Sequence, residues 1–258
     1  MNRNITKKAK SEITYSKMFW IFLLGSIAGF VLEGLWCIFK TGTWESHSST
    51  IIGPFCIIYG FGAVVVYLIS IRIKSRGLPL QFILFSVAAA IVEYFGSLFQ
   101  QIVFGSVSWD YSDHFMNISG RVSLRMALIW GVLGIFFVRF LFPVLVRFFG
   151  KIRHRIWKVV CTLLSVFMAV NLFLSATAII RWRERVTKNI LPDNAFEQFL
   201  DETYDNETMK QNYPNMKFMA EYFVNGDFYP KSEQETLISI QQMNMSVIKE
   251  PDAKTQSR

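Results

Sequence analysis

The sequence predicts an all-α membrane protein: a polytopic helix bundle with five transmembrane helices and a polar C-terminal tail carrying short amphipathic helices. Apolar residues make up 52% of the 258 residues, and only 18% are Asp, Glu, Lys or Arg, against about 25% in a typical soluble domain. Residues 1–180 hold six acids and 17 Lys or Arg, whereas the remaining residues hold 13 acids. Composition and its division along the chain therefore separate an apolar, basic body from a polar tail.

Five apolar runs reach the length of about 20 residues that a bilayer crossing needs. They are residues 18–39, 51–71, 80–104, 122–146 and 159–180. Lipid offers no hydrogen-bond partner to a bare backbone amide, so each run must be helical once it is inserted. Gly, Ala and Ser recur within the runs and allow close helix packing. We therefore expect one compact five-helix domain over residues 18–180.

Lysine and arginine in the short connections predict the orientation of this domain. Thirteen of them fall in the segment 1–17 and in the loops 72–79 and 147–158, against three in the other connections. This asymmetry predicts a multi-pass protein of the bacterial cytoplasmic membrane with residues 1–17 cytoplasmic and the tail 181–258 extracytoplasmic. The bases that follow the last helix oppose this placement of the tail. They are Arg181, Arg183, Arg185 and Lys188.

Two glutamates lie at membrane depth in this arrangement. From the outer ends of their helices, Glu33 is about 9 Å deep and Glu93 about 16 Å deep at 1.5 Å per residue. A charge at such depth costs several kcal/mol unless it is paired or wetted. We expect both side chains to face the bundle interior, near Arg125, Tyr59 or water, around a polar cavity open to the outside. The alternative is that the glutamates bridge helices through hydrogen bonds without any ligand.

The outer connection 108–121, SWDYSDHFMNISGR, gathers aromatic, acidic and amide side chains. Asp110 and Asp113 are three residues apart, a separation that can place two carboxylates on one side of a turn. One interpretation is a lid or re-entrant loop in which Arg121 pairs with an aspartate or an anionic ligand. The other is an interfacial loop held by salt bridges. The candidate ligand-binding residues are Glu33, Tyr59, Glu93, Tyr94, Trp109, Asp110, Tyr111, Asp113, Asn117, Arg121 and Arg125.

Several common sites are missing from the sequence. It contains no GxxxxGK[ST], no HExxH and no GxSxG pattern, which argues against an ATPase, a metal hydrolase and a serine hydrolase. The three histidines lie in different connections and the three cysteines show no paired spacing, so we expect no metal and no cofactor. The bases separate apolar runs, which argues against nucleic acid as a partner. Catalytic residues stay unassigned, and enzymatic activity is less expected than binding.

The tail shows local order. Asn194 precedes Phe196, Phe199 and Leu200 at helical spacing, which predicts a capped amphipathic helix. A second such helix is expected to start at Asn215, and residues 245–258 are expected to be unstructured.

The body resembles a bacterial membrane family described as putative ABC-transporter type IV, or CmpB-like. The resemblance covers roughly residues 18–150. The matching residues are Glu33, GPFCIIYGFGA at 53–63, which we expect to begin the second helix, Glu93–Tyr94, WDYSDHFMNISGR at 109–121, and Trp130–Gly131. The family implies the helical membrane fold and a transporter role without an agreed substrate.

These observations lead to one main hypothesis for function and two alternatives. The main hypothesis is an ABC-transporter-like permease subunit in the lipid bilayer. It handles a small polar solute through an outward-facing polar cavity, with a separate ATPase subunit or an ion gradient as energy source. The alternatives are an intramembrane enzyme acting on a lipid or envelope precursor, and a membrane sensor or scaffold.

Overall fold

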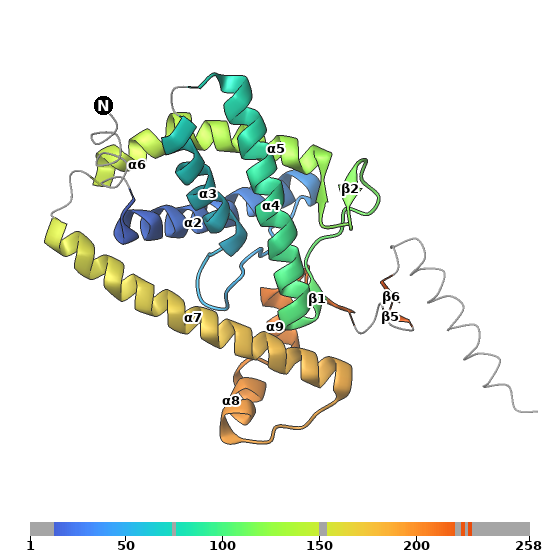
Figure 1. Cartoon of the computed structure of the whole chain (residues 1–258). Coiled ribbons are helices and arrows are strands. Elements are labelled where there is room, and N and C mark those ends of the chain that lie inside the picture. The colour runs from blue at the N-terminus through green and yellow to red at the C-terminus, as the bar shows by residue number, and fades with distance from the viewer. Residues whose placement is uncertain (1–12, 74–75, 150–153, 220–222, 225–226, 229–258) are drawn as a thin grey trace, which may run out of the picture. The chain divides into compact units, whose positions relative to one another are not determined.

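The computed structural model is mostly helical and describes residues 13–73, 76–149, 154–219, 223–224 and 227–228. The chain divides into two compact units, Met1–Phe218 and Met219–Arg258. Four helical segments in the first unit are long and apolar enough to cross a membrane (Figure 1). They are α2 (Tyr15–Thr41), α4 (Leu78–Phe104), the segment Leu124–Val144, and α7 (His154–Lys188).

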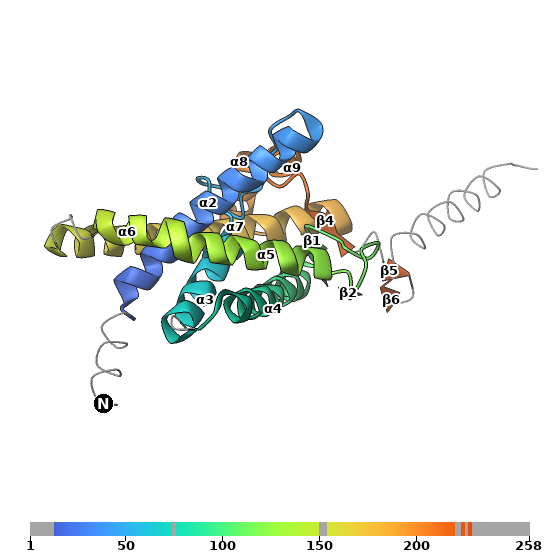
Figure 2. The ribbon, with the colours of Figure 1, turned by 90° about the horizontal axis from the view of Figure 1, so that it is seen from above.

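The third of these segments is built from three helical pieces. They are α5 (Leu124–Phe136), a π-helical turn η1 (Phe137–Leu141) and α6 (Phe142–Phe149), and Figure 2 shows them in one line. Ser123 caps the start of α5, because its side-chain oxygen accepts from the Met126 N–H. This hydrogen bond marks the point at which the polar connection 105–123 ends and the apolar segment begins.

Helix α3 (Ile57–Ile73) is shorter than the other apolar helices. Its 17 residues extend about 25 Å at 1.5 Å per residue, less than the roughly 30 Å of a hydrocarbon core. The helix begins at Ile57, within the stretch 53–63 that was expected to begin it. The first residues of the predicted run 51–71 are not helical, and Gly53 among them adopts a positive φ of 85° that interrupts a helix. The four longer segments support a multi-pass membrane protein, and the fifth crossing stays a prediction.

Glycines allow the helices of the bundle to approach closely. A side chain at Gly29 of α2 would overlap the ring of Tyr59 on α3. Gly60 of α3 lies against Ser26 of α2, and Gly131 of α5 lies against Ser86 of α4. Lipid provides no hydrophobic driving force between helices, so close van der Waals packing at small residues stabilises their association instead. These contacts fix α2 against α3 and α4 against α5.

Helix α4 has its polar face inside and its apolar face outside. Glu93 and Ser97 are buried, whereas Phe95, Phe99 and Ile102 are exposed large apolar residues. A soluble helix shows the reverse distribution. The pattern fits a helix whose outer face meets lipid and whose inner face carries the polar groups.

Residues 189–218 fold back onto the C-terminal half of α7, and we call this segment the cap. It contains α8 (Ala195–Thr203), α9 (Asn206–Asn212) and strand β4 (Lys217–Phe218), which pairs antiparallel with β1 (Ser106–Val107). The apolar core beneath it includes Trp182, Leu200, Met209 and Phe218. Strand β4 stands where a second amphipathic helix from Asn215 was expected, so that prediction is wrong.

The connection between α2 and α3 also attaches to α7. The Ile51 N–H donates to Ser175 Oγ at 2.9 Å, and the Ile52 N–H donates to Asn171 Oδ1 at 3.2 Å. Asn171 Nδ2 returns a bond of 2.6 Å to the Ile52 carbonyl. The connections 42–56 and 105–123 and the cap therefore meet at one end of the first unit.

The second unit is described only in part. Its strands β5 (Phe223–Val224) and β6 (Asp227–Phe228) pair antiparallel. The expected cytoplasmic segment up to residue 12 and the expected unstructured stretch 245–258 lie outside the described residues.

Candidate functional site

Glu33 of α2 is bonded to a tyrosine of the neighbouring helix. The Tyr59 hydroxyl donates a hydrogen bond of 2.6 Å to Glu33 Oε1, and Glu33 is half-buried. The glycine at position 29 lets the Tyr59 ring lie flat against α2, one turn before the glutamate. A small residue in the sequence thus positions an aromatic hydroxyl on an acid inside the bundle.

Glu93 of α4 is bonded in the same way, but to a tyrosine from the outer connection. The Tyr111 hydroxyl donates a hydrogen bond of 3.0 Å to Glu93 Oε1. Glu93 is only 4% exposed. Burial raises the pKa of the Tyr111 phenol above its ordinary value, and the nearby Glu93 raises it further. Tyr111 therefore stays protonated and donates to the Glu93 carboxyl group.

Trp130 of α5 joins the two pairs. Its ring centroid lies 4.6 Å from that of Tyr59, and its indole lies beside Glu93. Glu93 Oε2 and the Trp130 N–H are both buried, and neither makes a well-formed hydrogen bond within the described residues. Tyr111 is also within electrostatic range of Glu33. Glu33, Tyr59, Glu93, Tyr111 and Trp130 form what we call the acid–tyrosine cluster.

The connection 105–123 is a small folded unit that holds Tyr111 in place. Asp110 Oδ1 accepts hydrogen bonds from the Ser112 N–H at 2.9 Å and the Ser112 hydroxyl at 2.6 Å. Asn117 Nδ2 donates to the carbonyls of Ser112 and His114. The Tyr111 N–H donates to the Gly120 carbonyl at 2.7 Å. Asp110 and Asn117 thus build the turn that carries Tyr111.

This turn is closed by strands β2 (Asn117–Ile118) and β3 (Val122–Ser123), which pair antiparallel. Gly120 between them has a φ of 64°, a conformation that favours glycine. The loop leads directly into α5, so its position is fixed by the helix that carries Trp130.

Arg121 makes contacts only with neutral groups. Its guanidinium donates to Ser97 Oγ at 3.1 Å and to the Gln101 side-chain carbonyl, and it lies 5.9 Å from the Tyr94 ring centroid. Its carbonyl accepts from the Trp109 indole N–H at 2.9 Å. None of the ion pairs among the described residues includes Arg121. The expected pairing of Arg121 with an aspartate is therefore wrong, whereas the alternative, pairing with an anionic ligand, stays a prediction.

Two predicted residues stand apart from these contacts. Asp113 and Arg125 are exposed, and within the described part of the chain neither makes a hydrogen bond or ion pair. The expectation that Arg125 lies near the two glutamates is not supported by any contact. Asp113 lies in the turn that follows Tyr111, but it takes no part in the hydrogen bonds that hold this turn.

A cavity of about 110 Å³ touches the acid–tyrosine cluster at Tyr59 and Trp130. It lies between α2, α3, α4 and α5. Its lining includes Gly25, Gly29, Tyr59, Val66, Trp130 and Leu133. The lining is almost entirely apolar, so the polar cavity that the sequence predicts stays a prediction.

Sequence reasoning did not select three residues that the structure brings to the site. Trp130 contacts the cluster, and Ser97 and Gln101 hold Arg121. A signal for two of them was present, because Glu93, Ser97 and Gln101 are spaced four apart and share one face of α4. Trp130 carried no such signal beyond its place in the family resemblance.

The four membrane-length apolar segments, with polar groups facing inward and apolar groups outward, define a multi-pass helical membrane protein. Comparison with known families specifies the class further. The chain belongs to the family described as "Putative ABC-transporter type IV", whose model matches residues 20–176, more than half of the chain. That match includes every residue of the acid–tyrosine cluster.

A second family model, described as "Cysteine-rich KTR", matches residues 225–253. None of the three cysteines of the chain falls in this stretch. Comparisons with curated proteins and with solved structures gave no match.

Proposed function

We propose that this protein is a permease-like subunit that binds a small polar solute at the acid–tyrosine cluster and works with a separate ATPase subunit. The observation that carries the proposal is the pairing of two carboxylates from different helices with neutral tyrosines. Within the described residues no cation pairs with Glu33 or Glu93. A polar solute that donates hydrogen bonds, or carries positive charge, would supply the missing partner.

The outer connection supports a role in solute access. Tyr111 reaches the buried Glu93 from a folded loop, so displacing this loop would uncover the carboxylate. Trp109 of the same loop and Tyr94 of α4 both contact Arg121. We therefore propose that residues 108–121 act as the predicted lid, with Asp110 and Asn117 shaping it.

We also propose that residues 1–17 are cytoplasmic, residues 18–180 form the transmembrane domain, and residues 181–258 are extracytoplasmic in a bacterial cytoplasmic membrane. Contacts between the cap and both predicted outer connections support placement on a common side. The bases that were expected to follow the last helix lie within its final turns, because α7 extends to Lys188, and they oppose this placement less strongly than their number suggests. Arg181 and Arg185 are engaged with Asp201 and are not free to act as topology signals.

The proposal is tested by Glu33→Gln and Glu93→Gln in a strain that depends on this gene, with growth and uptake measured across candidate solutes. Both variants keep an acceptor for the tyrosine but lose the negative charge, so we expect uptake to fall at least tenfold. The control is Glu207→Gln, which removes an exposed acid of α9. Normal uptake of all solutes by both variants would contradict the proposal.

One observation favours a second candidate, an intramembrane enzyme acting on a lipid or envelope precursor. The apolar cavity lies directly beside Tyr59 and Trp130, where an acyl group could lie next to the acids. In this case Glu33 or Glu93 would act as general acid or base. Product formation by the purified protein without an ATPase or a gradient would favour the enzyme over the permease.

A further inference from the structure

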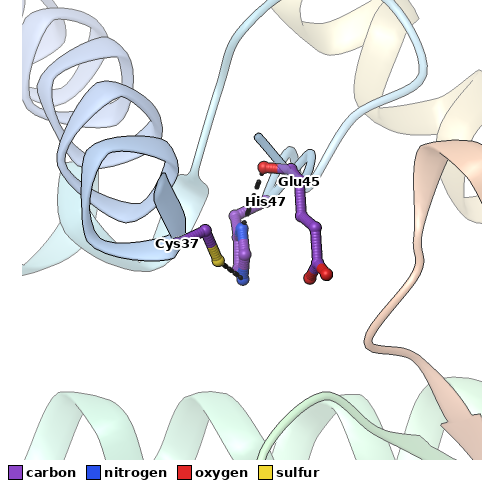
Figure 3. Close-up of side chains that lie close together, drawn as sticks. All are labelled: Cys37, Glu45 and His47. Carbon is purple, nitrogen blue, oxygen red and sulfur yellow. Dashed lines mark hydrogen bonds between the residues drawn. The ribbon is translucent and has the colours of Figure 1, made fainter. Parts of the chain in front are cut away.

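A cysteine, a glutamate and a histidine point their ligand atoms into one space at the C-terminal end of α2. Cys37 lies on the last turns of α2, and Glu45 and His47 lie on the connection that follows (Figure 3). The cysteine sulfur, one carboxylate oxygen and one ring nitrogen lie within 4.8 Å of one another. Cys37 is buried, and the other two residues are half-buried. None of these residues takes part in the acid–tyrosine cluster.

The ring of His47 is oriented as in metal sites. Its Nδ1 lies 3.2 Å from the Glu45 carbonyl oxygen, so Nδ1 carries the proton and donates it. This tautomer leaves a lone pair on Nε2, which lies 3.9 Å from Cys37 Sγ. Histidine ligands commonly donate their second N–H to a backbone carbonyl in this manner. The Nε2 lone pair therefore faces both the Cys37 sulfur and the amide nitrogen of Asn215.

The spacing is close to what a tetrahedral ion requires. Zinc bonds of about 2.3 Å to sulfur and about 2.0 Å to nitrogen place the two ligand atoms roughly 3.5 Å apart. The observed separation of 3.9 Å between Cys37 Sγ and His47 Nε2 exceeds this by a few tenths of an ångström. Rotation of the side chains is sufficient to close this difference.

The fourth position is next to Asn215, which comes from the cap. Asn215 Nδ2 lies 2.8 Å from His47 Nε2. An ion on Nε2 would displace this amide nitrogen, and a half-turn of the amide would present its oxygen instead. A thiolate in the ligand set excludes magnesium and calcium, which prefer oxygen ligands, and favours zinc.

We propose that Cys37, Glu45 and His47 bind a divalent transition-metal ion of the zinc type, with Asn215 or water as the fourth ligand. The ion fastens the end of α2 and the connection 42–56 to the segment that leads into β4. The sequence alone predicts no metal site, because Cys37 falls within an apolar run and its partners come from the connection that turns back over it. The site is separate from the proposed solute site.

The experiment uses the full-length protein in detergent, stripped with a chelator and titrated with cobalt(II) and then zinc(II). We expect one equivalent of cobalt to give visible bands of tetrahedral intensity and a near-ultraviolet sulfur-to-cobalt charge-transfer band, both removed by zinc. Cys37→Ser should lose the charge-transfer band. His47→Gln and Glu45→Gln should each weaken binding at least tenfold.

The matched control is Cys161→Ser, because Cys161 is also buried but lies on α7, away from Glu45 and His47. It should bind cobalt as the wild type does. Gel filtration and thermal melting show whether each variant remains folded, and His47→Gln tests the site without altering the buried face of α2. A wild-type protein without the charge-transfer band, or a band that persists in Cys37→Ser, would overturn the proposal.

Discussion

The cap and the acid–tyrosine cluster differ in the partners of their buried charged groups. In the cap, Arg181 is only 2% exposed and donates two hydrogen bonds of 2.9 and 2.8 Å to Asp201. Arg185 binds the same carboxylate, and Glu197 lies 3.8 Å from Arg181. In the cluster, Glu33 and Glu93 meet only neutral donors among the described side chains, namely the Tyr59 and Tyr111 hydroxyls and the Trp130 indole beside Glu93.

The difference separates a structural role from a binding role. A buried ion whose charge is compensated within the protein stabilises one arrangement of the chain and has little left to offer a ligand. A carboxylate that meets only neutral donors keeps most of its electrostatic attraction for another partner. The cap therefore has the properties of a scaffold, and the cluster has those of a binding site. Substitutions in the cap test its role as a scaffold, and substitutions in the cluster test its role as a binding site.

The largest effect on stability is expected from Asp201→Ala. The substitution leaves the buried Arg181 without its main partner, which costs about 3 kcal/mol when a buried pair is broken. We expect the cap to be released from α7 and to become sensitive to protease. Thermal melting and limited proteolysis of the purified protein measure this, with exposed Glu202→Ala as the control. Equal protease resistance in both variants would show that the ion pair does not hold the cap.

Gly29→Ala is expected to lower the free energy of unfolding by about 2 kcal/mol, because the added carbon overlaps the Tyr59 ring. Tyr59 must then move away from Glu33. The control is Gly62→Ala on α3, where an added carbon meets nothing within 4 Å. Thermal melting should show a lower midpoint for Gly29→Ala alone. Equal melting midpoints for the two variants would show that the Tyr59 ring can accommodate a carbon at position 29 without a loss of stability.

The sequence alone was sufficient to predict the helical membrane fold. Apolar runs are long, local signals, and four of the five predicted runs became helices of membrane length. The run at 51–71 illustrates the limit of this reasoning. Its first residues are apolar, yet Gly53 turns the backbone and Asn171 of α7 binds the Ile52 main chain. Hydropathy does not register a positive φ or a partner that lies far along the chain.

The candidate site was predictable in its acids but not in its bonds. The cost of a charge in lipid places Glu33 and Glu93 inside the bundle, and both are found there with tyrosine partners. The partner of Arg121 was mispredicted, because opposite charge suggests an aspartate whereas α4 offers Ser97 and Gln101 one and two turns after Glu93. The neutral partners of Arg121 depend on how its loop packs against α4. No short sequence pattern predicts this packing.

Acidification is expected to weaken the cap by less than removal of the side chain does. Hydrogen bonds from Arg181, with a further contribution from Arg185, hold the pKa of Asp201 below its ordinary value. The stability from this carboxylate is therefore complete above the unfolded pKa of about 3.9 and is lost as the pH falls through the lower, folded-state pKa.

Melting curves of the wild type and Asp201→Asn from pH 6 to pH 2.5 test this expectation. The wild type should lose more stability than the variant between pH 4 and the acid end of the series. Asp205 also has a lowered pKa, caused first by the backbone N–H of Thr208, and it titrates equally in both proteins. Parallel curves for the two proteins would contradict a stabilising role for ionised Asp201.

The smallest effect on stability is expected from Glu93→Gln. The amide oxygen can still accept from Tyr111, and a neutral group in place of a carboxylate lowers the cost of burial in the bundle. We expect a change of less than about 1 kcal/mol, in either direction, measured by melting in detergent. The same variant should lose uptake, so stability and function separate at this residue. A large fall in stability would mean that the Glu93 charge is compensated as Asp201 is, and the contrast between scaffold and site would then disappear.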